Sequence, residues 1–186
     1  AVATGAAIAA GAGLDGVLDT VAVVVAERML RYDTAGEFDL HDDFGWLDIT
    51  HGLTYANAVR WHVANRVATT GTVDGDLVRL VLWCAFLANW TGRHEWHTTV
   101  GGQAEVESAD DDLAAYGCRL QDASLLDSAG AFIVQAHAVK TSVAATEEAV
   151  RIGSAAPLDA VARFLDAPRL ERFVAANVVR SIDFLS

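Results

Sequence analysis

Apolar residues recur at the spacing of an α-helix along most of this chain, and patterns typical of β-strands are scarce. Between Leu14 and Arg31 most apolar side chains lie three or four positions apart, although the valine-rich residues 21–25 alone would also fit a strand. Good helix formers such as Glu27 and Met29 extend this run, so we predict a helix there. The pattern of the whole chain predicts an all-α bundle of six to eight helices.

Capping residues and breaks in the pattern place the other helices. They are expected from Asp48 or Thr50 to about residue 68, from Leu77 to Trp90, from Ser108 or one of Asp110 to Asp112 to about Leu120, from Leu125 to Ile152, from Pro157 to Asp166, and from Pro168 to about Asp183. The helix at 77–90 is apolar around nearly its whole circumference, which predicts a central buried position. Near the end of the longest helix, Glu147 and Glu148 are expected to pair with Arg151.

The chain has 186 residues, of which 53% are apolar, and this is enough to bury the core of one domain. Within it, residues 1–12 are expected to be a flexible or excised start and 98–112 a mobile loop. The formal charge of −12 would repel a phosphate backbone, so we expect no nucleic-acid partner. Lys140 is the only lysine beside 12 arginines, a usage typical of a GC-rich bacterial genome.

The sequence lacks the features that are typical of several classes of protein. Cys84 and Cys118 have no paired spacing, which argues against disulfides and favours a cytoplasmic location. The longest apolar runs are too short to span a bilayer, so a soluble protein without a membrane partner is expected. There is no phosphate-binding glycine motif and no serine-hydrolase elbow, so no nucleotide cofactor is expected.

Six histidines carry most of the chemical information. His51 begins the predicted second helix, and Tyr55 follows it on the same stripe. Asp48 lies three residues before His51 and could ligate a metal beside it or orient its ring. His94 and His97 would share one face if the preceding helix continued through them, whereas their geometry stays open if that helix ends at Gly92.

His137 lies in the longest helix among apolar neighbours, with Lys140 one turn later. A nearby ammonium group would lower the pKa of His137, unless the lysine extends to solvent. A single histidine on an apolar face is more typical of a hydrogen-bonded core residue than of a ligand. His51, His97 and His137 come from different helices or helix ends and together indicate a shared polar site, while His41 and His62 are interpreted as surface or packing residues.

Two stretches, WLDITHGLTYANAVRW at 46–61 and AHAVKTSVAATEEA at 136–149, resemble the helical region of questin-oxidase-like proteins, a family that includes fusions to Rieske iron–sulfur domains. The resemblance implies an all-helical oxidase- or oxygenase-type fold in which His51 and His137 match the histidine-bearing helices. The cysteine and histidine pairs of a Rieske centre are missing here, so an iron–sulfur cluster would belong to another part of the parent protein.

The leading hypothesis is a helical oxidoreductase domain that acts on a small molecule. Its predicted cofactor is a mononuclear non-haem iron or another transition metal, because histidines outnumber candidate carboxylates. The predicted metal ligands are His51, His94, His97 and His137, and the predicted catalytic residues are Asp48, Tyr55 and Lys140. The alternatives are a non-catalytic module that docks onto a partner domain or forms a homo-oligomer, and a metal-free pocket for an organic ligand.

Overall fold

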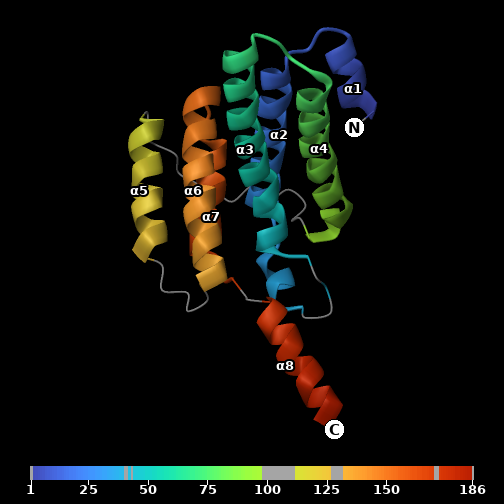
Figure 1. Cartoon of the computed structure of the whole chain (residues 1–186). Coiled ribbons are helices and arrows are strands. Elements are labelled where there is room, and N and C mark those ends of the chain that lie inside the picture. Colours follow the sequence, from blue (N-terminus) through green and yellow to red (C-terminus); the bar gives the residue numbers. More distant parts are fainter. Residues whose placement is uncertain are drawn as a thin grey trace.

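The computed structural model describes residues 2–39, 42, 44–97, 112–126, 132–169 and 172–185 (Figure 1), of which 95–97, 172–174 and 176 are described by their backbone alone. Its elements are α1 (Val2–Ala9), α2 (Leu14–Arg31), η1 (Thr34–Phe38), α3 (Trp46–Thr70), α4 (Gly75–Thr91), η2 (Gly92–His97), α5 (Leu113–Leu126), α6 (Phe132–Ile152), α7 (Ala156–Asp166) and α8 (Arg172–Leu185). The α elements are α-helices and the η elements are short 3₁₀ helices. This confirms the predicted all-α bundle.

Helix α2 lies at the centre of the bundle and packs against α3, α4 and α7 (Figure 1). Helix α3 also packs against α6, which in turn contacts α5 and α7. At one end of the bundle α1 lies beside α4, and at the other end α8 projects beyond the packed helices. The neighbours α3 and α6 run in the same direction, so residues further along α3 meet residues further along α6.

The prediction that α4 is the central buried helix is wrong. Trp83 and Trp90 on its outer face keep 54% and 46% of their surface exposed. Only one stripe of α4 is buried, formed by Leu77, Val81, Cys84, Ala88 and Thr91. Apolar residues around a whole helix therefore do not establish that every face is covered, because a protein surface also holds many apolar atoms.

Three helix boundaries differ from the predictions because polar side chains bond within a helix instead of capping one, and a fourth differs in that α8 begins at Arg172 and not at Pro168. Helix α3 begins at Trp46, and the Asp48 carboxylate accepts the Gly45 amide at 3.0 Å from inside its first turn. Ser124 lies within α5, where its hydroxyl donates to the Gln121 carbonyl at 2.7 Å. Helix α5 therefore continues past Leu120 to Leu126, and α6 begins only at Phe132.

The sequence predicts a flexible or excised segment at 1–12 and no disulfide between the two cysteines. Residues 2–9 form α1, whereas the expected mobile loop at 98–112 lies outside the described residues apart from Asp112. Both cysteines are free, as predicted, with Cys84 buried and Cys118 exposed.

The packing of α5 on α6 depends on Gly117. A Cβ atom at this position would lie 2.3 Å from Thr146 Cγ2 and 2.5 Å from Thr146 Oγ1. Thr146 has little freedom to move, because its hydroxyl donates to the Ser142 carbonyl and accepts from Gln121. The two helices can approach this closely only because residue 117 has no side chain.

We expect Gly117→Ala to lower the free energy of unfolding by about 1–3 kcal/mol through overpacking. The matched control is Gly16→Ala in α2, where a Cβ would meet nothing within 4 Å. That control should raise stability by up to about 1 kcal/mol, because alanine is the better helix former. Urea denaturation measures both changes, and equal effects at the two glycines would contradict the close approach.

Candidate functional site

His51 of α3 and His137 of α6 form a pair, with their Nε2 atoms 2.9 Å apart and their rings inclined at 62°. His137 Nδ1 lies 2.8 Å from the Ile133 carbonyl oxygen. Because a carbonyl can only accept, Nδ1 of His137 carries a hydrogen, and Nε2 of the neutral ring is an acceptor. His51 must then donate from Nε2, which leaves its Nδ1 as a hydrogen-bond acceptor.

The surroundings of the pair favour neutral imidazoles. Burial, Lys140 and His137 together lower the pKa of His51 to about 4, although His51 keeps an exposed edge. Burial and Lys140 also lower the pKa of His137, while the Ile133 carbonyl and Asp48 act in the opposite direction. Lys140 therefore acts on His137 in the predicted direction, while its side chain also stays accessible to solvent.

Beside the pair, an open groove of about 590 Å³ lies over α3 and is bordered by α4 and α6. Its lining comprises His51, Thr54, Tyr55, Asn57 and Ala58 of α3, Leu87 of α4, and Lys140 and Ala144 of α6. Burial lowers the pKa of Lys140, and burial together with Cys84 raises the pKa of Tyr55. The groove therefore combines a phenol that stays protonated, an amine that loses its proton more easily than usual and a neutral imidazole.

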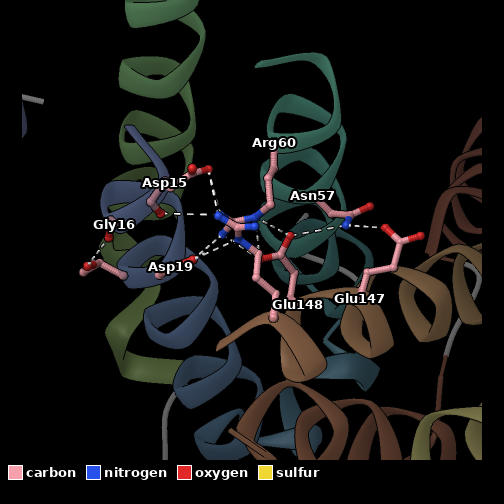
Figure 2. Close-up of polar contacts among 9 residues, drawn as sticks. Asp15, Gly16, Asp19, Asn57, Arg60, Glu147 and Glu148 are labelled. Atoms are coloured by element: carbon pink, nitrogen blue, oxygen red, sulfur yellow. Dashed lines mark hydrogen bonds and ion pairs between the residues drawn. The ribbon is translucent and has the colours of Figure 1, made fainter. Parts of the chain in front are cut away.

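Further along the same two helices, an ion pair joins Arg60 of α3 to Glu148 of α6 (Figure 2). Arg60 donates to the Glu148 carboxylate from Nε at 3.0 Å and from Nη2 at 2.8 Å. Glu148 is 0% exposed and Arg60 7%. Asp15 and Asp19 of α2 also contact the guanidinium group, at 3.4 and 2.8 Å. One arginine thus connects three helices.

The predicted pairing of Glu147 and Glu148 with Arg151 is wrong. Glu148 points into the bundle toward Arg60, and Glu147 accepts a hydrogen bond from Asn57 at 2.8 Å. Arg151 reaches Asp15 instead, at 3.1 Å. Helical spacing shows which charges could meet on one helix, but it does not reveal a partner on another helix that offers a buried contact.

The structure brings four of the predicted site residues together. His51, Tyr55 and Lys140 line the groove, and His137 contacts His51. Asp48 lies at the start of α3, where its carboxylate bonds Gly45 and raises the pKa of His137.

The other histidines lie elsewhere or are not described. The ring of His94 in η2 stacks on Phe44, with centroids 4.0 Å apart. His62 is exposed on α3, and both His41 and the side chain of His97 lie outside the described residues. Within the described part of the chain, no three histidine, cysteine, aspartate or glutamate side chains gather as a metal-binding group.

The sequence reasoning missed the apolar part of the groove. Leu87 and Ala144 carry no chemical signal, and only the folded structure places them beside Tyr55 and Lys140. Ala58 was not missed, because the helical spacing of the sequence already places it on the stripe of His51 and Tyr55.

We expect the low pKa of His51 to make stability depend on pH. Between pH 6.5 and about 4 the unfolded chain takes up a proton at His51 that the folded chain does not bind. The stability gained from the neutral ring is therefore complete above pH 6.5 and is lost as the pH falls toward 4. Urea denaturation of the wild type and of His51→Gln across this range isolates the contribution from that of the many carboxylates. Equal pH profiles, or an NMR titration midpoint of His51 near 6.5, would contradict the prediction.

Comparisons of the chain with models of known families, with curated proteins and with solved structures find no match. No described helix is both long and apolar enough to cross a membrane.

Proposed function

We propose that this chain is a helical domain that binds a small organic molecule in the groove beside His51 and His137. The observation that carries the proposal is the histidine pair at 2.9 Å, which leaves Nδ1 of His51 as an imidazole acceptor in a groove of about 590 Å³ that an amine and a phenol also line. Ligand sites typically combine an apolar lining with a few converging polar groups. Here Leu87, Ala58 and Ala144 supply the apolar surface.

The chemistry of these groups favours a ligand with an oxygen function. Tyr55 and Lys140 can donate hydrogen bonds to a carbonyl, hydroxyl or carboxylate oxygen, and His51 Nδ1 can accept one from a hydroxyl group. An imidazole with a pKa of about 4 is a weak base at neutral pH, so hydrogen bonding is its main role and proton exchange with the ligand is secondary.

Ligand-observed NMR with a library of small alcohols, carboxylates and carbonyl compounds tests this function. His51→Gln should weaken binding by about tenfold, which corresponds to the loss of about 1.4 kcal/mol. His62→Gln is the matched control, because it removes an exposed histidine of the same helix outside the groove lining. A library without binders, or equal losses in both variants, would overturn the proposal.

The metal-dependent oxidoreductase predicted from the sequence stays a prediction with its own measurement. Elemental analysis of protein purified without a histidine tag should find about one transition metal per chain if the histidines form a mononuclear centre. A metal that is retained by His62→Gln and lost in His51→Gln would replace the metal-free proposal. A metal-free protein that binds organic ligands would support it.

Association with a second copy is a second candidate function, supported by apolar surfaces on α4 and α8. On α4 a separate groove of about 590 Å³ is lined by Leu80, Leu82, Trp83 and Phe86 and carries Asp76 and Arg79. On α8, Val178, Val179, Ile182 and Leu185 are exposed along one stripe. Asp76 and Arg79 already pair with each other on α4, so burial of the two apolar surfaces would drive the association.

Light scattering on the purified chain tests this association. A dimer that dissociates in Ile182→Ser and persists in Phe184→Ser, a change on the opposite side of α8, would support docking through the stripe. A monomer at high concentration would contradict it.

A further inference from the structure

Lys140 is the only lysine of the chain, and it lines the groove while part of its side chain stays exposed to solvent. Its position on α6 follows from helical spacing, because His137, Lys140 and Ala144 fall on one face at intervals of three and four residues. This face turns toward α3, where His51 and Tyr55 line the same groove. The single primary amine among the side chains therefore sits beside the proposed ligand.

An amine becomes a nucleophile only when it is neutral, and burial in the groove favours that form. Burial lowers the pKa of Lys140 below its ordinary value. The Tyr55 hydroxyl, which stays protonated, can donate a hydrogen bond to the carbonyl oxygen of an aldehyde or ketone in the same groove. Lysines whose pKa is lowered by partial burial can form Schiff bases with carbonyl compounds.

We propose that Lys140 condenses with an aldehyde or ketone group of a small molecule bound in the groove. The proposal rests on the proposed function and specifies its ligand class. The lone pair of Nζ adds to the carbonyl carbon while the oxygen takes up a proton. One of the two Nζ protons is given up in this addition, so a neutral carbinolamine forms. The C–O bond then breaks, and the hydroxyl group leaves as water with the remaining Nζ proton, which gives a C=N bond. No oxidant or reductant takes part.

Reductive trapping tests the proposal, with benzaldehyde as the probe and sodium cyanoborohydride as the trapping agent. Peptide mass spectrometry then compares Lys140 with the α-amino group of the same chain. At pH 7 an ordinary lysine of pKa about 10.4 should lag behind an α-amine of pKa about 7.8 by more than about 100-fold. We expect Lys140 to be labelled within about tenfold of the α-amine, because its neutral fraction and its local aldehyde concentration are both raised.

Two variants test whether the groove makes Lys140 reactive or whether any accessible lysine is labelled at the same rate. Ala64→Lys adds a reference amine on the exposed side of α3, and Lys140 should be labelled at least about tenfold faster than that lysine. Ala58→Phe fills part of the groove from its exposed lining and should slow labelling of Lys140, whereas labelling at position 64 should stay unchanged. Unfolding in guanidinium chloride should make the two lysines equivalent.

Benzyl alcohol distinguishes failure of this inference from failure of the proposed function, because it offers a similar ring without a carbonyl group. Binding of benzyl alcohol in a His51-dependent manner, without preferential labelling of Lys140, would overturn the imine and leave the ligand groove intact. Absence of both binding and preferential labelling would overturn both. Preferential labelling that benzyl alcohol slows would support both.

Discussion

Replacing Glu148 with alanine is expected to lower the free energy of unfolding by about 3–5 kcal/mol, the range for removing one partner of a buried ion pair. The carboxylate is 0% exposed and accepts from both Nε and Nη2 of Arg60. Its loss leaves the guanidinium group of Arg60, a residue only 7% exposed, with the more exposed Asp15 and Asp19 as its remaining acid partners. Urea or thermal denaturation measures the change.

Glu147→Ala is the matched control, because it removes the adjacent acid on the exposed side of the same helix. Its loss of stability should stay within about 0.5 kcal/mol, as for most surface substitutions. The double variant Arg60→Met/Glu148→Leu should recover much of the stability lost in Glu148→Ala, since apolar residues can replace a buried ion pair. Similar effects of the two alanine variants would contradict the importance of the buried pair.

Replacing Glu37 with alanine is expected to cost about 2–4 kcal/mol, because each buried donor left without an acceptor costs about 1–3 kcal/mol. The Glu37 side chain is 1% exposed and accepts from the Tyr32 hydroxyl at 2.9 Å and from the Trp46 amide at 2.7 Å. These bonds join the end of α2 to the start of α3, and Trp46 and Tyr32 also pack edge to face. Denaturation followed by tryptophan fluorescence measures the loss.

Two variants bracket the effect at Glu37. Glu37→Gln keeps an oxygen acceptor of the same reach and should cost less than half as much as alanine. Glu27→Ala removes an exposed acid of α2 and should change stability by at most about 0.5 kcal/mol. If the glutamine variant is as unstable as the alanine variant, the acceptor is not the reason for the loss.

The helices of this chain are largely predictable from sequence because local signals define them. The bounds of α2 follow from apolar spacing, and those of α4 and α7 from the cap at Asp74 and from Pro157 at the first turn. Which helix is central could not be predicted, since α2 and α4 are both rich in apolar residues. That choice depends on which faces meet in three dimensions, as the exposed Trp83 illustrates.

The candidate site was predictable only in its chemically distinctive members. Their residue types single out His51, His137, Tyr55 and Lys140, and the structure places all four together. Glu147 and Glu148 are adjacent glutamates, and nothing in the local sequence distinguishes them. Glu148 could not be recognised as the buried partner of Arg60, because 88 residues separate the two in sequence. His94 is as chemically distinctive as the other histidines, but the structure places it outside the groove lining, where its ring stacks on Phe44.

Because α3 and α6 pack in parallel, the Arg60–Glu148 ion pair fixes the position of one helix along the other and so aligns the two histidines. Two helices can slide past each other by a turn of about 5.4 Å, and such a slip would separate Nε2 of His51 from Nε2 of His137. Arg60 lies nine residues after His51 on α3, or about 13.5 Å along the axis at 1.5 Å per residue. The alignment of the two imidazoles therefore depends on a contact outside the groove lining. The residues of the groove can change in evolution while this contact keeps the two helices in place.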